Sequence, residues 1–277
     1  MVRVAAVQLS SQEDVQTNLA QALSLVERAA TGGATLVTLP ENMAKMSASP
    51  ITAAVAREMA RIDGSTRDGA EGALLETLSS WAKRFSIHLL AGSVPEIVVD
   101  QEKVYNTSYL FGPTGDVITK YRKIHLFDVV TPDGQAYRES DHFLAGDACV
   151  TADVAGTRCG LSICYDLRFP ELYRTLVGEG AKVLFVPAAF TLSTGKDHWL
   201  ALLRARAIEN QCFVIAPAQW GKHPGGRQTF GKSAIIDPWG EVIACASEGV
   251  GIAVADLDFS YLDSVRTNLP ALRHRRQ

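Results

Sequence analysis

The sequence predicts an α/β fold of the four-layer α-β-β-α type, in which two sheets pack face to face and helices cover their outer faces. Two observations lead to this prediction. Strand-like and helix-like segments alternate along the chain as they do in β-α-β units. The same order of elements then occurs twice, once in each half of the chain. We expect one domain over residues 1–277, and a lone sheet with helices on both faces would contradict the prediction.

The first half opens with a β-α-β unit, because a short valine-rich run is followed by a helical apolar stripe and by a second apolar run that ends at Pro40. The second strand is expected to lie parallel to the first. The expected elements of this half are strand 2–8, helix 16–30, strand 34–39, helix 71–85, strand 87–92 and a hairpin of 105–111 with 117–121.

The second half repeats this order and also some of the residues. Its expected elements are strand 158–163, helix 171–179, strand 183–187, helix 197–210, strand 212–217 and a hairpin that turns at 237–240. GATLVTLPE at 33–41 aligns with GAKVLFVPA at 180–188, and SYLFGPTGDVIT from Ser108 aligns with SAIIDPWGEVIA from Ser233. Two related halves, each a sheet with helices on one face, predict sheets packed on each other with helices outside.

Composition and charge exclude several classes of function. The 277 residues carry 27 Lys and Arg against 30 Asp and Glu. This balance lacks the excess of positive charge that is typical of proteins that bind nucleic acid or an anionic membrane. No apolar run approaches the ~20 residues of a membrane span, and the first residues lack a signal-peptide pattern, so a cytoplasmic protein is expected. The six histidines show no metal-ligand spacing, and nucleotide-binding glycine motifs are absent, so neither a metal nor another cofactor is expected.

The five cysteines are odd in number and form no C-x-x-C pair, so reduced thiols are expected. Four of them lie in or beside apolar strands and are interpreted as structural residues. These four are Cys149, Cys159, Cys212 and Cys245.

Cys164 differs from the other four cysteines because it closes the strand 158–163 and precedes a helix start at Pro170 and Glu171. A cysteine on such a strand-to-helix turn is expected to be exposed at the edge of the sheet. The helix N-terminus and the nearby Arg168 would favour the thiolate, which is the nucleophilic form. The alternative is a buried structural cysteine.

Glu41 directly follows an apolar strand and Pro40, where a carboxylate is costly unless it has a function. Its counterpart in the second half is Ala188, so the architecture does not itself require an acid at this position. A helix cap or an exposed loop acid is the alternative. Lys123 and Glu139 carry no such signal, and each taken alone indicates a surface residue.

Three segments in chain order resemble the three catalytic motifs of the nitrilase superfamily of carbon–nitrogen hydrolases. They are LPEN around Glu41, YRKIHLFD around Lys123 and CYDLRFPE from Cys164. The resemblance runs from VAAVQL near the start to HRR near the end. It implies the α-β-β-α fold, a Glu–Lys–Cys triad, and Glu139 as a second, supporting glutamate.

These residue types fit the chemistry of a thiol amidase that acts on a small-molecule amide. Glu41 would take the thiol proton of Cys164, whose sulfur attacks the amide carbonyl and forms a thioester. The ammonium of Lys123 and the backbone N–H of Tyr165 would hold the oxyanion. Glu139 would position Lys123 or the substrate, and Glu41 would then protonate the leaving amine and activate water.

Within the superfamily, further stretches resemble the branch that contains deaminated glutathione amidase. They are HLFDV from His125, FTLSTGKDHWLALLRARAIE from Phe190, GKSAIIDPWG from Gly231 and LRHRR near the end. This resemblance implies a substrate with a 2-oxoglutaramate end, cleaved to 2-oxoglutarate and cysteinylglycine. Arg168 would bind its carboxylate, and Phe190 and Thr194 would line the pocket. The alternative for Arg168 is an i, i+3 ion pair with Glu171.

The remaining expectations concern the surroundings of this site. The least regular stretches, where specificity could reside, are 42–68, 125–148 and 218–230. The helix 197–210 carries Arg204, Arg206 and Glu209, which we interpret as packing and ion-pair residues. Similarity to the family implies a homodimer.

Three alternatives for the function remain open. The first is another carbon–nitrogen substrate, such as 2-oxoglutaramate itself, an N-carbamoyl amino acid or a nitrile. The second is a redox protein that uses a Cys164 thiol of low pKa, although Cys159 is a poor resolving partner because it lies only five residues upstream. The third is a catalytically silent binding protein.

Overall fold

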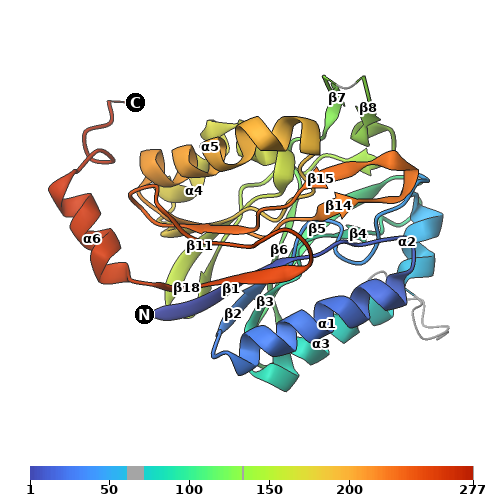
Figure 1. Cartoon of the computed structure of the whole chain (residues 1–277), viewed down its shortest axis with the longest axis horizontal. Coiled ribbons are helices and arrows are strands. Elements are labelled where there is room, and N and C mark those ends of the chain that lie inside the picture. The colour runs from blue at the N-terminus through green and yellow to red at the C-terminus, as the bar shows by residue number, and fades with distance from the viewer. Residues whose placement is uncertain (61–71, 133, 277) are drawn as a thin grey trace.

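Alternate residues of the first strand contact two different layers of the molecule. Strand β1 (Val2–Gln8) places Val4 and Ala6 in the core between two sheets, and Ala5 and Val7 in the core beneath helices. This is the pattern of a strand that is covered on both faces. The computed structural model describes residues 1–60, 72–132 and 134–276 and shows the resulting layers (Figure 1).

The first sheet has eight strands, six of them in the order β18-β1-β2-β3-β5-β4, with β6 and β9 paired to β5. Strand β2 lies parallel to β1, and β5 with β6 forms an antiparallel hairpin, so both predictions are confirmed. The other strands of this sheet are β2 (Leu36–Thr38), β3 (His88–Leu90), β4 (Val94–Glu96), β5 (Val104–Phe111), β6 (Val117–Arg122), β9 (Phe143–Leu144) and β18 (Gly251–Leu257).

The second sheet has six strands in the order β10-β11-β12-β13-β16-β17. Its centre is parallel, and the predicted second hairpin is β16 with β17. The strands are β10 (Thr151–Val154), β11 (Thr157–Leu161), β12 (Val183–Phe185), β13 (Phe213–Ala216), β16 (Ala234–Ile236) and β17 (Val242–Cys245).

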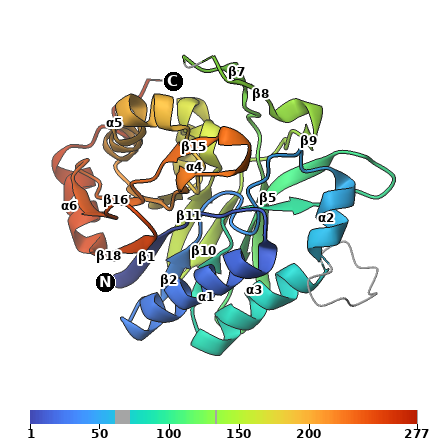
Figure 2. The same cartoon turned by 45° about the vertical axis from the view of Figure 1, so that its right-hand side comes forward.

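Helices cover the outer faces of both sheets (Figures 1 and 2). One pair of helices is α1 (Val15–Thr31) with α3 (Gly72–Phe85), and the other pair is α4 (Pro170–Gly178) with α5 (Leu192–Asn210). Leu19 of α1 and Trp81 of α3 pack in the core beneath the first sheet's helices, while Leu176 of α4 and Leu203 of α5 pack against the second sheet. The predicted α-β-β-α fold is therefore confirmed, whereas the single domain over residues 1–277 stays a prediction.

Strand β18 joins the end of the chain to the first sheet, an arrangement that the repeat of two halves did not predict. It pairs antiparallel with β1 along the whole of β1, and helix α6 (Phe259–Asn268) follows it (Figure 2). The partner strand lies almost the whole chain away, so local sequence pattern does not indicate this pairing.

The stretches expected to be irregular contain further short elements. Helix α2 (Ala53–Ala60) lies in the stretch 42–68, whose last part, 61–68, is outside the described residues. The other two stretches contain β7 (Asp128–Val130), β8 (Ala136–Arg138), the 3₁₀ turn η1 (Glu139–Asp141), β14 (Trp220–Lys222), η3 (Pro224–Gly226) and β15 (Gln228–Phe230).

Helix α5 begins at Leu192, earlier than the predicted residue 197. The polar, glycine-containing start of this helix looks like a loop in the sequence. Gly195 is required there because Phe230 of β15 packs against the helix, and a Cβ at Gly195 would lie 2.4 Å from the Cβ of Phe230. The tertiary contact thus explains a residue that is unfavourable in an isolated helix.

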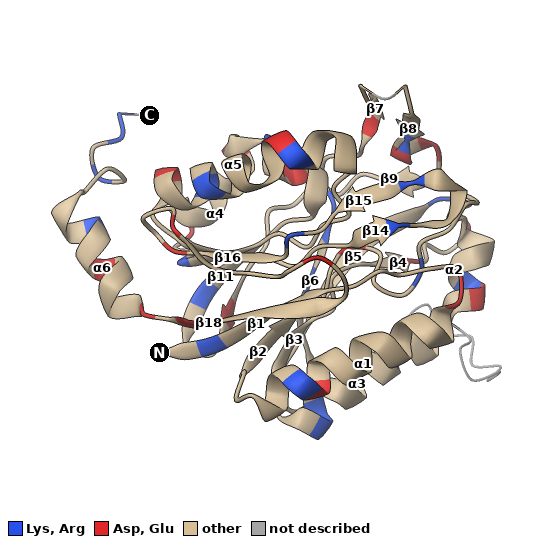
Figure 3. Cartoon of the chain, viewed as in Figure 1, with Lys and Arg blue, Asp and Glu red and all other residues tan. Residues whose placement is uncertain are grey.

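Charged residues of both signs are interspersed over the described chain (Figure 3). Among the helices that the structure describes, none is long and apolar enough to cross a membrane.

Glu96 of β4 is an acid inside the first sheet, with 6% of its surface exposed. Its carboxylate accepts hydrogen bonds from Arg122 at 2.6 and 3.0 Å, from Thr107 at 2.8 Å and from Lys120 at 2.9 Å. Burial alone would raise the pKa of Glu96, but these hydrogen bonds outweigh it and lower the pKa from 4.5 to about 2. Glu96 therefore stabilises the fold above about pH 4.5, and this contribution disappears as the pH falls towards 2.

We expect Glu96→Gln to lower the free energy of unfolding by about 2–3 kcal/mol near neutral pH and by much less near pH 3. Urea unfolding at both pH values measures this difference. The control is Asp153→Asn, because Asp153 pairs with Arg158 on the surface and such pairs contribute little. An equal loss at both pH values would contradict this account of Glu96.

Candidate active site

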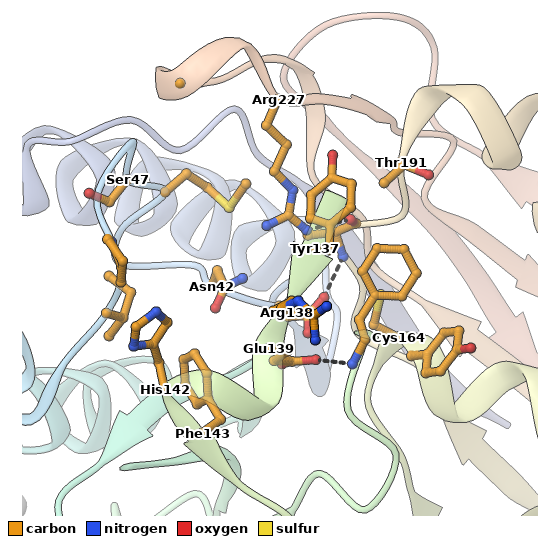
Figure 4. A pocket seen from close by; sticks show the side chains of 18 of the residues that line it. Asn42, Ser47, Tyr137, Arg138, Glu139, His142, Phe143, Cys164, Thr191 and Arg227 are labelled. Atoms are coloured by element: carbon orange, nitrogen blue, oxygen red, sulfur yellow. Dashed lines mark hydrogen bonds between the residues drawn. The ribbon is translucent and has the colours of Figure 1, made fainter. Parts of the chain in front are cut away.

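Polar side chains from both sheets gather where three strands end. Glu41 lies just beyond β2, Lys123 directly after β6 and Cys164 just beyond β11, and all three line one cavity of about 430 Å³. Figure 4 shows Glu139 and Cys164 facing this cavity. The carboxyl ends of neighbouring strands are a common position for ligand sites in α/β folds. The structure thus brings together the residues that the three motifs indicate.

Glu41 is fixed from both sides of its carboxylate. Oε1 accepts hydrogen bonds from Nζ of Lys123 at 2.8 Å and from Nδ2 of Asn106 at 3.0 Å, while Oε2 accepts from the N–H of Ala189 at 2.8 Å. Its turn packs tightly against Gly92, where a Cβ would lie 2.0 Å from the carbonyl oxygen of Pro40. The alternative of an exposed loop acid is wrong.

Lys123 is a buried cation between two carboxylates, with 2% of its surface exposed. Its Nζ donates to Glu41 and to both oxygens of Glu139, at 3.1 and 2.9 Å. Without the family motifs, Lys123 and Glu139 are each expected to lie on the surface. That interpretation is wrong, because the fold closes over both side chains and pairs them.

The charges in this group stabilise one another. Burial alone would lower the pKa of Lys123, but the charges of Glu139 and Glu41 outweigh it, so the pKa lies above its ordinary value. Burial alone would likewise raise the pKa of Glu41, and Lys123 holds it below its ordinary value instead. The ammonium of Lys123 and the carboxylate of Glu41 are therefore both charged near neutral pH.

Cys164 opens the 3₁₀ turn η2 (Cys164–Arg168) and is buried, with 8% of its surface exposed. Its φ of 49° lies in the left-handed region, which costs a non-glycine residue about 1–3 kcal/mol and is frequent at functional sites. Burial and the charge of Glu41 raise the pKa of the thiol well above its ordinary value, although Lys123 opposes them.

Two expectations about Cys164 are therefore wrong. The residue is not exposed at the sheet edge, because the surrounding loops cover it, and its resting form is the thiol rather than the thiolate. The negative charge of Glu41 and the loss of water around the sulfur outweigh the cations nearby. An ionised carboxylate beside a neutral thiol is the arrangement that lets a base take the proton while the sulfur attacks.

Asp166 is a buried residue of η2 that sequence reasoning missed. Oδ2 accepts from the N–H of Ile163 at 2.8 Å and from the hydroxyl of Tyr121 at 2.7 Å. Oδ1 accepts from the N–H of His125 at 3.0 Å and lies 2.7 Å from its Nδ1. Asp166 thus ties the turn that carries Cys164 to the segment that carries Lys123.

Asn106 and Arg227 are two more site residues that sequence reasoning missed. Asn106, on β5, donates to Glu41 and, at 3.2 Å, to Oε1 of Glu139, so it bridges the two carboxylates. Arg227 donates from Nη2 to the carbonyl oxygen of Ala189 at 3.0 Å. Neither residue belongs to a motif with a spacing signal, and only the fold brings them to Glu41.

Phe190 and Thr194 line the cavity, as do Arg168 and Tyr165. The roles predicted for these four residues in binding the substrate stay predictions. The guanidinium of Arg168 lies over the ring of Phe190, 5.1 Å from its centroid, and over Tyr165 at 5.9 Å. Among the described residues no ion pair joins Arg168 to Glu171, so the alternative is not observed.

The helix α5 carries the three charged residues expected to pack between layers. Arg206 donates to the carbonyl oxygen of Leu167 at 2.7 and 3.1 Å and pairs with Glu209 at 2.9 Å. Arg204 donates to the carbonyl oxygen of Gly240 at 2.7 Å. The structural interpretation of all three is confirmed.

All five cysteines have free thiols in the structure. Cys159 and Cys212 are buried, and burial raises the pKa of Cys212 to about 11. Cys149 is half-buried and Cys245 is exposed, so the interpretation of Cys245 as a buried structural residue is wrong. In the part of the chain that the structure describes, no cluster of His, Cys, Asp and Glu could hold a metal ion.

Comparison with known proteins agrees with this geometry. The family model for carbon–nitrogen hydrolases matches residues 3–267. The chain belongs to the carbon–nitrogen hydrolase family. It is thus a hydrolase of carbon–nitrogen bonds, and the resemblance carried by the three motifs is confirmed.

Relatives and a solved structure refine the comparison. The chain is 46% identical to the deaminated glutathione amidase of Synechocystis sp. over 98% of this chain and 97% of that protein. It is 38% identical to omega-amidase NIT2 of Homo sapiens over 99% and 95%. The crystal structure of Saccharomyces cerevisiae Nit3, a member of branch 10 of the nitrilase superfamily, superposes with a TM-score of 0.84 at 33% identity, covering 100% of this chain and 97% of that one.

Proposed function

We propose that this chain hydrolyses deaminated glutathione to 2-oxoglutarate and cysteinylglycine, with Cys164 as nucleophile. The observation that supports this most is that Cys164, Glu41 and Lys123 line one cavity, where Nζ of Lys123 donates to Oε1 of Glu41 at 2.8 Å. Arg168 beside Phe190 offers a cation for the carboxylate of the acyl half. The name of the 46% identical relative supports the same substrate.

Acylation begins when Glu41 takes the thiol proton and the sulfur of Cys164 attacks the amide carbon. The carbonyl π electrons move to oxygen, and the ammonium of Lys123 and the N–H of Tyr165 stabilise the oxyanion. Glu139 acts as a positioning residue, because it fixes Nζ of Lys123 by two hydrogen bonds. When the intermediate collapses, the carbon–nitrogen bond breaks and Glu41 gives its proton to the leaving amine.

Deacylation uses the same three side chains, with water in place of the amine. Glu41 takes a proton from water, and the hydroxide oxygen attacks the thioester carbon while Lys123 again holds the oxyanion. The carbon–sulfur bond then breaks, the acid product leaves, and the sulfur of Cys164 recovers its proton from Glu41. The cycle therefore consumes one water and leaves the protein unchanged.

Hydrolysis of 2-oxoglutaramate is the second candidate function. This amide has the same acyl half, so Arg168 and Phe190 would bind it in the same way, and the relative named omega-amidase supports it. N-carbamoyl amino acids and nitriles lack this support. A redox role is disfavoured because the pKa of Cys164 is raised rather than lowered.

The test is release of 2-oxoglutarate, coupled to a dehydrogenase, from deaminated glutathione and separately from 2-oxoglutaramate. The proposal expects hydrolysis of both amides, with the higher kcat/KM for deaminated glutathione. Higher kcat/KM for 2-oxoglutaramate would support the second candidate. No release from either amide would contradict both candidates, and N-carbamoyl and nitrile substrates would then be assayed.

We expect Arg168→Gln to lower kcat/KM by about 10- to 100-fold on both amides, because both lose the same charge-assisted hydrogen bonds. Steady-state kinetics on the two substrates measure this loss. The control is Arg174→Gln on α4, because Arg174 pairs with Glu209 outside the cavity. Unchanged KM and turnover in Arg168→Gln would remove Arg168 from the carboxylate site.

We also propose a cytoplasmic homodimer. Five free thiols support a reducing compartment. An exposed apolar patch supports a second copy, since Ile208 of α5 is 50% exposed and Trp239 of the neighbouring turn is 54% exposed.

A further inference from the structure

Arg227 lies at the end of the η3 turn and reaches into the cavity from the side opposite Glu139 (Figure 4). Its guanidinium lies over the ring of Tyr137, 5.6 Å from the centroid. The neighbouring Gly225 packs against Ala48, so this part of the cavity wall is formed by the stretches 42–68 and 218–230. These are two of the stretches that contain no recognisable motif.

The guanidinium of Arg227 has far more donors than it uses. Nη2 donates to the carbonyl oxygen of Ala189, while Nε is buried without a hydrogen-bond partner. Arg227 forms no ion pair with the described residues. Two other cations of the cavity wall are already neutralised, because Lys123 pairs with Glu41 and Glu139, and Lys45 pairs with Glu13 at 2.8 Å. A buried, unpaired arginine donor at a cavity is the chemistry of an anion site.

Arg227 is linked through one peptide group to Glu41, the proposed proton donor to the leaving amine. The peptide group of Ala189 connects it to Glu41, because the carbonyl oxygen of Ala189 accepts from Arg227 and its N–H donates to Glu41. Glu41 is the group that gives a proton to the leaving amine. Arg168, in contrast, lies on the turn of Cys164 and against Phe190, on the side proposed for the acyl half.

We propose that Arg227 binds a carboxylate on the amine half of the substrate. The subsite would select amides whose leaving amine is an anionic peptide, over amides that release ammonia or an uncharged amine. In deaminated glutathione this group is the carboxylate of the terminal glycine. The inference rests on the proposed function, because it takes Glu41 as the donor to the leaving amine.

Two substrates that differ in one group test this directly. They are deaminated glutathione and its analogue with a carboxamide in place of the glycine carboxylate. We expect the wild type to prefer the carboxylate by about 10- to 100-fold in kcat/KM, the usual contribution of a charge-assisted hydrogen bond. Arg227→Gln should reduce this preference to about twofold or less, and Arg227→Lys, which keeps the charge, should retain part of it.

Arg138 provides the matched control, because it is an exposed arginine of β8 that lines the same cavity. Arg138→Gln should keep the wild-type preference for the carboxylate. Arg168→Gln should lower kcat/KM on both substrates by a similar factor, since they share the acyl half. Thermal unfolding of each variant shows whether it is folded.

The outcomes separate this inference from the proposed function. If the wild type releases 2-oxoglutarate from both substrates with equal kcat/KM, the proposed function stands and the role of Arg227 is wrong. A preference that survives in Arg227→Gln, or that disappears in Arg138→Gln, also overturns the inference. If neither these substrates nor 2-oxoglutaramate is hydrolysed, the proposed function itself fails and the inference fails with it.

Discussion

Replacing Cys164 with alanine is expected to lower 2-oxoglutarate release by about a thousandfold or more, because no other group in the cavity can form the thioester. Glu41 and Lys123 would remain and would still polarise the amide, which sets only a low residual rate. The coupled assay with deaminated glutathione measures the loss. Substrate affinity should change little, because the sulfur bonds to substrate only during the reaction.

The matched control is Cys245→Ala, which removes an exposed thiol away from the cavity. This variant should hydrolyse the amide at the wild-type rate. Near-normal turnover in Cys164→Ala would exclude the proposed mechanism. Equal losses in both variants would indicate that the effect arises from the fold and not from the nucleophile.

Replacing Lys123 with methionine is expected to abolish activity and also to destabilise the protein. The substitution leaves Glu41 and Glu139 as buried carboxylates with no cation between them. Removing one partner of a buried ion pair costs about 3–5 kcal/mol. The burial of Lys123 between two carboxylates is therefore the reason to expect a loss of stability as well as of activity.

The pH dependence identifies the cause of this destabilisation. Without Lys123 the pKa of Glu41 rises, so the folded variant takes up a proton that the unfolded chain binds less strongly. Its free energy of unfolding, relative to wild type, should therefore recover as the pH falls from about 8 to about 5. Urea unfolding across this range measures the recovery.

The control for Lys123→Met is Lys120→Met. Lys120 also pairs with a buried glutamate, Glu96, but it is partly exposed, and Arg122 would remain as a partner for that acid. Its loss should cost less and should show no recovery at lower pH. A Lys123→Met protein as stable as wild type at both pH values would contradict the buried three-charge arrangement.

The arrangement of layers was predictable because its signals are local. Apolar runs of strand length, such as residues 2–8 and 34–39, correspond closely to β1 and β2. Strand β18 was not predictable in the same way, because its place beside β1 depends on a partner at the other end of the chain. The same limit applies to helix α2, which lies in a stretch without clear periodicity.

The site was predictable only in part. Glu41 could be singled out because an acid follows a buried strand and the repeated half has Ala188 there. The motifs indicated Lys123 and Cys164, but neither their burial nor the raised pKa of the thiol. Both depend on loops and charges that the fold brings from distant segments. The position of Arg227 at the cavity likewise depends on the fold and has no signal in the sequence.

Covalent catalysis by Cys164 is tested by intact-protein and peptide mass spectrometry of wild type, quenched in acid during the first turnover of deaminated glutathione. We expect a 2-oxoglutaryl group bound to the peptide that contains Cys164, and no adduct in Cys164→Ala. An acyl group on any other residue, or oxidation of Cys164 in place of acylation, would contradict this mechanism.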